Sequence, residues 1–151
     1  MQEHVFMMGE YEARFPVEFY YAKNHMWAQS LGGDCWRFGL SGYAVRLLQD
    51  VYFLDLTIES EMQLAARQEI GSIESKKAES SLYSPIAGTV TNLNDDLLQD
   101  PTAINVDKYG KGWMFELDGP GDQLLKIDEY LEHLNKAWEI AQRTIKGQAN
   151  A

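Results

Sequence analysis

Residues 73–90 decide the fold of this chain, and they read Ile73-Glu74-Ser75-Lys76-Lys77-Ala78-Glu79-Ser80-Ser81-Leu82-Tyr83-Ser84-Pro85-Ile86-Ala87-Gly88-Thr89-Val90. Two apolar, alternating runs flank a short polar turn that contains lysine, and alternation with a period of two predicts strands. Proline and glycine supply turn chemistry at the far end of the second run. The stretch therefore predicts a β-hairpin that holds a lysine at its tip, away from the core.

Outward from this hairpin, most of the chain predicts short strands. We expect them at residues 17–21, 25–30, 35–40, 51–56, 68–75, 82–93 and 113–117. Ser41 is a candidate N-cap for a short helix that ends near residues 49–50. A single helical turn is expected at residues 94–99, stopped before Pro101. The pattern predicts a mostly β core with short helices.

The C-terminal region predicts one long helix. Apolar residues follow three- and four-residue steps there, at Ile127, Tyr130, Leu131, Leu134, Trp138, Ala141 and Ile145. We expect this stripe to pack on the body of the protein. The predicted organisation is an N-terminal arm over residues 1–16, a β domain over 17–121 and a packed C-terminal helix over 122–147.

Composition excludes several classes of function. The 151 residues suffice for one domain, and the formal net charge of −10 argues against nucleic acid and anionic membranes as partners. No transmembrane run or secretory signal is visible. The single Cys35 agrees with a reducing compartment, so we expect a cytoplasmic protein. His4, His25 and His133 have no ligand-like spacing with Cys35, so no metal site is expected.

Four motifs of this chain occur in the same order as in a known family, and together they carry a family resemblance. They are Tyr21-Ala22-Lys23-Asn24-His25-Met26-Trp27, Phe38-Gly39-Leu40-Ser41-Gly42-Tyr43-Ala44, the 73–90 hairpin, and Tyr109-Gly110-Lys111-Gly112-Trp113. Over roughly residues 19–131 the chain resembles the glycine cleavage system H proteins. The resemblance implies a flattened β-sandwich of the biotinyl/lipoyl carrier type, a barrel-sandwich hybrid, with short helices and a C-terminal α-helix.

The resemblance also implies a modified lysine. When Glu74-Ser75 and Tyr83-Ser84-Pro85 are aligned with the family motif, the lysine that carries lipoic acid, as lipoyl-lysine, is Lys77. Glu74, Ser75 and Ala78 then form the hairpin around it. Lys76 is the competing target. His25 is a candidate for lining a pocket for the loaded arm, although a strand histidine beside an aromatic residue also suits a structural role.

The family role is that of a non-catalytic carrier in glycine catabolism. The resemblance implies that the lipoyl arm shuttles an aminomethyl group among glycine decarboxylase, aminomethyltransferase and dihydrolipoamide dehydrogenase, after a lipoylating enzyme has attached it. No nucleophile–base–orienter set is visible in the sequence, which agrees with a carrier.

Departures from the family pattern leave the partners open. Met26 stands where the family usually has an acid, residues 60–61 and 65–67 replace turn glycines, and Lys76 replaces an apolar residue. A lipoyl carrier for another lipoamide-dependent pathway, such as sulfur-compound oxidation or lipoate relay, is one alternative, and an unmodified scaffold of the same fold is another. A biotin carrier of the same fold is a further alternative. Biotin carriers usually flank their lysine with methionines, whereas Lys76 and Ala78 flank Lys77, which argues against biotin.

Overall fold

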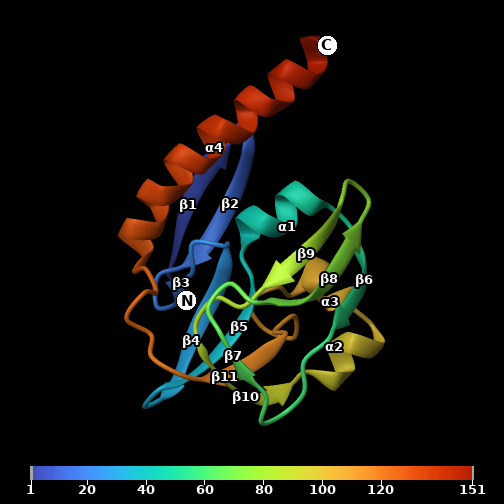
Figure 1. The fold of residues 1–151 in the computed structure, drawn as a ribbon. Coiled ribbons are helices and arrows are strands. Elements are labelled where there is room, and N and C mark those ends of the chain that lie inside the picture. The colour runs from blue at the N-terminus through green and yellow to red at the C-terminus, as the bar shows by residue number, and fades with distance from the viewer. Residues whose placement is uncertain (1, 151) are drawn as a thin grey trace.

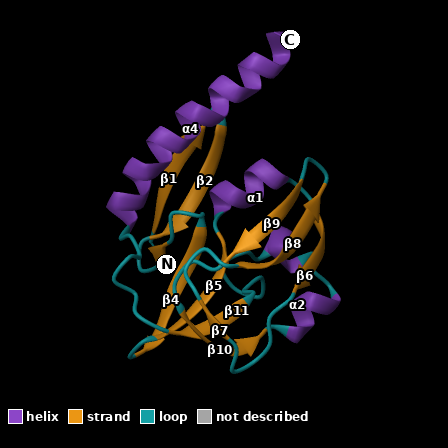
Figure 2. Ribbon diagram, viewed as in Figure 1, coloured by secondary structure: helices purple, strands orange, loops and turns teal. Residues whose placement is uncertain are grey.

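The computed structural model describes the backbone of residues 2–150 and the side chains of residues 2–143. Its strands are β1 (Glu3–Met8), β2 (Tyr11–Pro16), β3 (Tyr20–Tyr21), β4 (Met26–Gly32), β5 (Cys35–Leu40), β6 (Val51–Leu56), β7 (Gln63–Leu64), β8 (Glu69–Ser75), β9 (Glu79–Tyr83), β10 (Gly88–Leu93) and β11 (Phe115–Asp118). Its helices are α1 (Gly42–Leu48), α2 (Asp95–Gln99), α3 (Ala103–Val106) and α4 (Ile127–Asn150). The fold is mostly β with a long C-terminal helix, as predicted (Figures 1 and 2).

Two antiparallel sheets form the body. The larger has the order β3-β4-β5-β11-β10-β7, and the smaller has the order β6-β8-β9. Phe38 and Phe115 of the larger sheet share one apolar cluster with Leu54 and Ile73 of the smaller sheet, and all four are buried. Burial of large apolar side chains contributes about 1.5–3 kcal/mol each. This shared core is the predicted lipoyl-carrier β-sandwich.

The N-terminal arm forms a structure that the sequence pattern did not predict. β1 and β2 pair as an antiparallel hairpin in register from Glu3 with Pro16 to Met8 with Tyr11, around a turn that contains Gly9. Gly9 has a φ of +66°, in the left-handed region that glycine enters without strain. The arm is thus an ordered two-stranded sheet, drawn in blue beneath α4 in Figure 1.

Two predicted strands need correction. Residues 17–21 contribute only the two-residue β3, since β2 already ends at Pro16. The predicted run 82–93 divides into β9 and β10, which lie in different sheets. Ser84 is fully buried between them, and its Oγ donates a hydrogen bond to the Ile86 carbonyl at 2.7 Å. The Ser84-Pro85 turn therefore moves the chain from one sheet to the other.

The long helix α4 begins later than predicted, at Ile127 rather than at Asp122. Leu125 precedes it as an extended residue, because its N–H and C=O exchange hydrogen bonds of 2.7 and 2.8 Å with Tyr21. The Glu129 carboxylate accepts a hydrogen bond from the Lys126 N–H at 3.0 Å, which satisfies a free donor at the start of the helix.

Up to Trp138, the apolar stripe of α4 packs on the N-terminal hairpin and its surroundings, and not on the main sandwich core. The side chain of Ile145 lies outside the described residues. Tyr130 and Leu134 are fully buried in a second cluster with Phe15 and Trp27, and Leu131 and Trp138 pack against its margin. Figure 1 shows α4 lying along β1 and β2 and then extending beyond the body.

Candidate carrier-lysine site

The predicted hairpin is formed by β8 and β9, which pair from Glu69 with Tyr83 to Glu74 with Glu79. Ser75 ends β8 and Glu79 begins β9, so the connection consists of residues 76–78. All three of these residues are exposed. Strand β9 therefore begins earlier than the sequence suggested, and the polar turn is shorter. Figure 1 shows this tip projecting from the body beside the C-terminal end of α1.

Ser75 holds the tip closed. Its N–H donates to the Ala78 carbonyl at 2.8 Å, and its Oγ accepts a hydrogen bond from the Ala78 N–H at 3.2 Å. The same hydroxyl lies 2.6 Å from the Leu48 carbonyl, to which it donates. Ser75 is 6% exposed, so these bonds are shielded from water. The side chain therefore ties the hairpin tip to α1 as well as to itself.

The C-terminal end of α1 supports the tip. The last carbonyls of a helix have no partner within the helix. Here the Lys76 N–H donates to the Gln49 carbonyl at 3.0 Å, and the Lys77 N–H donates to the Leu48 carbonyl at 3.2 Å. The backbone of both lysines is thus fixed by hydrogen bonds to another element. Their side chains make no ion pair with any described residue.

These contacts produce an exposed amine on a rigid base. Both lysines are exposed, so exposure does not choose between them, and alignment with the family motif is the basis for preferring Lys77. Glu74 is half-buried on the sheet face beside the tip, where it pairs in register with Phe53 of β6 and with Glu79 of β9. Such a site suits covalent attachment of a mobile group.

The sequence did not reveal the support from α1. Leu48 and Gln49 lie 27 or more positions from the residues that they hold, and carbonyl acceptors leave no side-chain signature. The sequence contained one signal. The predicted helix ends near residues 49–50 and the predicted strand begins at residue 51, so the chain must bend sharply between them. Gln49 and Asp50 both adopt positive φ, at +54° and +45°, which bends the chain sharply beneath the tip.

Replacement of Ser75 by alanine tests the support of the tip. The Ala78 N–H would lose its Ser75 partner and the Leu48 carbonyl would keep only the Lys77 N–H, and a typical hydrogen bond contributes about 0.5–1.5 kcal/mol. We expect Ser75→Ala to lower the free energy of unfolding by about that amount, measured by urea denaturation. Faster amide exchange at residues 76–78 should accompany the loss. Ser72→Ala on the same strand is the control, and an equal loss there would contradict a specific role for Ser75.

His25 lies beneath α4. Its Nδ1 is 2.9 Å from the Tyr130 hydroxyl, and its ring centroid is 4.6 Å from that of Tyr43 and 5.5 Å from that of His133. Burial, and to a lesser degree the nearby His133, lowers the pKa of His25 to about 4. The Tyr130 hydroxyl is already the hydrogen-bond partner of the His25 Nδ1. The surroundings of His25 therefore fit a structural role better than a role in an arm pocket.

The depressed pKa of His25 predicts a pH dependence of stability. The unfolded chain binds the proton near pH 6.5 and the folded chain only near pH 4. Stability should therefore be complete above pH 6.5 and fall as the pH drops toward 4, by up to about 3 kcal/mol. Urea denaturation across this range tests it, with His25→Asn as the control because asparagine tolerates the φ of +71°. A wild-type slope equal to that of the variant would contradict the assignment.

Met26 is 1% exposed in the main core. An apolar side chain therefore fills the position where the family pattern usually has an acid.

Within the described residues, no group of three or more histidine, cysteine, aspartate or glutamate side chains is placed to hold a metal ion. Among the described helices, none is both long and apolar enough to span a membrane.

Comparison with known proteins gives a consistent result. The family model described as "Glycine cleavage H-protein" matches residues 19–144. A glycine cleavage system H protein of Mycobacterium avium (strain 104) is 39% identical over 102 residues, which cover 68% of this chain and 76% of that protein. One of Coxiella burnetii (strain Dugway 5J108-111) is 34% identical over 105 residues, which cover 70% of this chain and 80% of that protein.

A solved structure is similar as well. The crystal structure of a glycine cleavage system H protein from Mycobacterium marinum matches with a TM-score of 0.69 at 28% identity. The match covers 80% of this chain and 99% of the other.

Proposed function

The chain belongs to the glycine cleavage H-protein family, and from that premise we propose that it is a non-catalytic lipoyl carrier whose arm is attached to Lys77. The observation that carries the proposal is the tip geometry. The Lys77 N–H is held by the Leu48 carbonyl at 3.2 Å, while the side chain is exposed. A fixed anchor with a free amine is what a swinging arm requires.

The residues at the tip fit a lipoyl group. Lysine offers a primary amine on a flexible four-carbon stem, and acylation removes its charge. A bound lipoyl group supplies a dithiolane that can accept and release cargo. The chain supplies the rest: Ser75 closes the turn, α1 fixes the backbone, and the exposed tip leaves room for a lipoylating enzyme to reach the amine.

The partners that we propose are glycine decarboxylase, aminomethyltransferase and dihydrolipoamide dehydrogenase, with an aminomethyl group as cargo. An exposed face beside the tip supports docking of large partners. Tyr52 and Phe53 of β6 are 61% and 44% exposed. Phe53 pairs with Glu74 on the neighbouring strand β8, and Glu74 pairs in turn with Glu79 on β9. Aromatic residues rimmed by carboxylates are suited to a partner surface with apolar and basic groups.

A second candidate function has one specific observation in its favour. Met26 is buried in the core where the family pattern usually presents an acid. A buried thioether carries no charge, so this chain lacks the acid that the family pattern has there. We therefore keep open a lipoyl carrier that serves another lipoamide-dependent pathway, such as sulfur-compound oxidation or lipoate relay.

Reconstitution with purified glycine decarboxylase tests the proposed function. We expect the lipoylated protein to support the exchange of labelled bicarbonate into glycine, and the protein octanoylated at Lys77 to support none, because octanoate has the arm without the sulfurs. A glycine cleavage H protein of known activity is the positive control. If the lipoylated chain stays inactive beside an active control, the aminomethyl assignment is wrong and the second candidate remains.

A further inference from the structure

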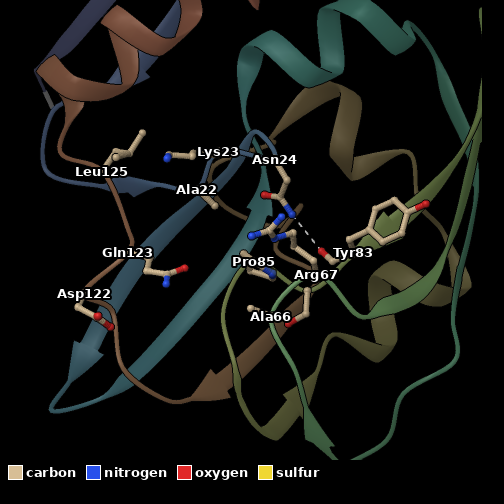
Figure 3. A pocket seen from close by; sticks show the side chains of 11 residues that line it. Ala22, Lys23, Asn24, Ala66, Arg67, Tyr83, Pro85, Asp122, Gln123 and Leu125 are labelled. Carbon is tan, nitrogen blue, oxygen red and sulfur yellow. Dashed lines mark hydrogen bonds between the residues drawn. The ribbon is translucent and has the colours of Figure 1, made fainter.

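A pocket of about 960 Å³ opens at the base of the hairpin, at the opposite end of β9 from the lysine tip. Figure 3 shows that its walls come from four segments of the chain. Three of them are the β3–β4 loop with Lys23 and Asn24, the β7–β8 turn with Arg67, and the end of β9 with Tyr83. The pre-helix segment with Asp122 forms the far side.

Arg67 occupies an unusual backbone position. Its φ is +68°, in the left-handed region where a non-glycine residue is strained by about 1–3 kcal/mol. The position is imposed by the surrounding turn, since the Arg67 N–H donates to the Ser84 carbonyl at 2.9 Å and the Gln68 N–H donates to the Ala65 carbonyl at 3.2 Å. Glycine would satisfy this geometry without strain. The chain instead has an arginine here, and Figure 3 shows its guanidinium directed into the pocket beside Asn24.

The cations of this pocket are unpaired. Neither the Arg67 guanidinium nor the Lys23 ammonium makes an ion pair or side-chain hydrogen bond with any described residue, although acidic residues outnumber basic ones by 23 to 13. Asn24 is fixed across the pocket, because its amide nitrogen donates to the Tyr83 carbonyl at 3.0 Å (Figure 3). Arg67 and Asn24 therefore present free donors side by side, and the Lys23 nitrogen lies on the opposite side of the pocket, toward Leu125 (Figure 3). The rest of the lining includes the apolar residues Ala22, Pro85 and Leu125 and one acidic residue, Asp122.

We propose that this pocket binds a small oxyanion group, a carboxylate or an oxyacid of sulfur or phosphorus, with Arg67 as its principal ligand and Lys23 as a second cation. Guanidinium offers a planar pair of N–H donors that match two oxygens of such a group. The apolar lining residues would accept the carbon chain or sulfur atom that bears it.

Two sources could supply the group. β9 has five residues between tip and pocket, a span of about 13 Å at 3.3 Å per residue step. The end of an arm on Lys77 lying along this strand is one source, and that source rests on the proposed function. A free anion in solution is the other, and it requires no modification.

Titration of the unmodified protein with sodium sulfate at constant ionic strength, followed by ¹H–¹⁵N NMR, tests the site itself. We expect saturable shifts in the Asn24 carboxamide, the Arg67 Nε–H and the Ser84 amide. Arg67→Gly should weaken binding by about tenfold or more while keeping the turn, because glycine prefers the positive φ. Lys136→Gln, on the exposed face of α4, removes the same charge elsewhere and should change the affinity less than twofold.

The second experiment separates the sources. In a Cys35→Ser background the lipoylated protein is reduced and its arm alkylated with iodoacetate, which adds a carboxylate, or with iodoacetamide, its neutral analogue. Pocket shifts in the carboxylate adduct alone, with weakened sulfate binding, identify the arm as the source. Pocket shifts with sulfate but none with either adduct identify a free anion.

Absence of saturable shifts with sulfate and with the charged adduct, or an Arg67→Gly affinity equal to that of the wild type, would overturn the site. Failure of lipoylation would remove only the adduct experiment, and the sulfate titration would still decide the proposal.

Discussion

Replacement of Lys77 by arginine is expected to abolish lipoylation and all arm-dependent turnover, whereas Lys76→Arg should be modified fully. Arginine keeps the charge, and the backbone N–H at this position would still reach the Leu48 carbonyl, so the tip should keep its structure. Its guanidinium stays protonated and does not form the amide. The measurement is lipoylation of the two variants in parallel with one lipoylating enzyme, followed by digestion and mass spectrometry of the tip peptide.

The pair of variants also distinguishes chemistry from docking. Both remove one exposed lysine from the same bend, so a lipoylating enzyme that needed only a cationic tip would treat them alike. Full modification of Lys77→Arg, or loss of modification in Lys76→Arg alone, would show that the attachment site is Lys76.

Replacement of Tyr130 by alanine is expected to lower the free energy of unfolding by about 3–5 kcal/mol, the range for large aromatic truncations in a core. The ring is fully buried and stacks on Tyr21 at 4.6 Å, with Phe15 edge-on at 5.5 Å. Its hydroxyl lies 2.9 Å from both Ser41 Oγ and His25 Nδ1, so truncation also leaves buried polar groups unpaired.

Urea denaturation of Tyr130→Ala, Tyr130→Phe and Glu132→Ala measures this loss. Phenylalanine keeps the stacked ring and loses the two hydroxyl contacts, so about 1–3 kcal/mol is expected. Glu132 is exposed on the same helix, and its replacement should stay within about 0.5 kcal/mol. If Tyr130→Ala is as stable as Glu132→Ala, α4 contributes little to the fold and its packed face does not anchor the N-terminal hairpin.

The parts of the fold with strong local signals were predictable. β5 and β6 have the predicted bounds, since each is a run rich in β-branched or aromatic residues between clear breaks. α1 begins where Ser41 was expected to cap it, with Ser41 Oγ accepting the Ala44 N–H at 3.5 Å. The lysine hairpin followed from alternation and turn chemistry in the same way.

The parts that depend on distant contacts were not predictable. β1 is exposed along most of its length and reads as no strand by alternation, because the cluster beneath α4 supplies its packing partner. The start of α4 is delayed by pairing between Leu125 and Tyr21, more than a hundred residues earlier. Segments of this kind become ordered only in the tertiary context.

The candidate site divides in the same manner. The motif identified the lysines and Ser75, which lie next to one another in sequence. It did not identify the helix carbonyls that hold them, nor Arg67, whose importance lies in a left-handed backbone that directs its side chain toward Asn24. Backbone acceptors and strained turns carry no residue-type signature beyond an absent glycine.

Mass spectrometry of the protein purified from its own host tests the carrier assignment most directly. Intact mass followed by mapping of the peptide that contains residues 76–78 should show one lipoyl increment, located on Lys77. A biotin increment, an unmodified chain from cells whose other lipoyl proteins are fully loaded, or a lipoyl group on Lys76 would each contradict the account.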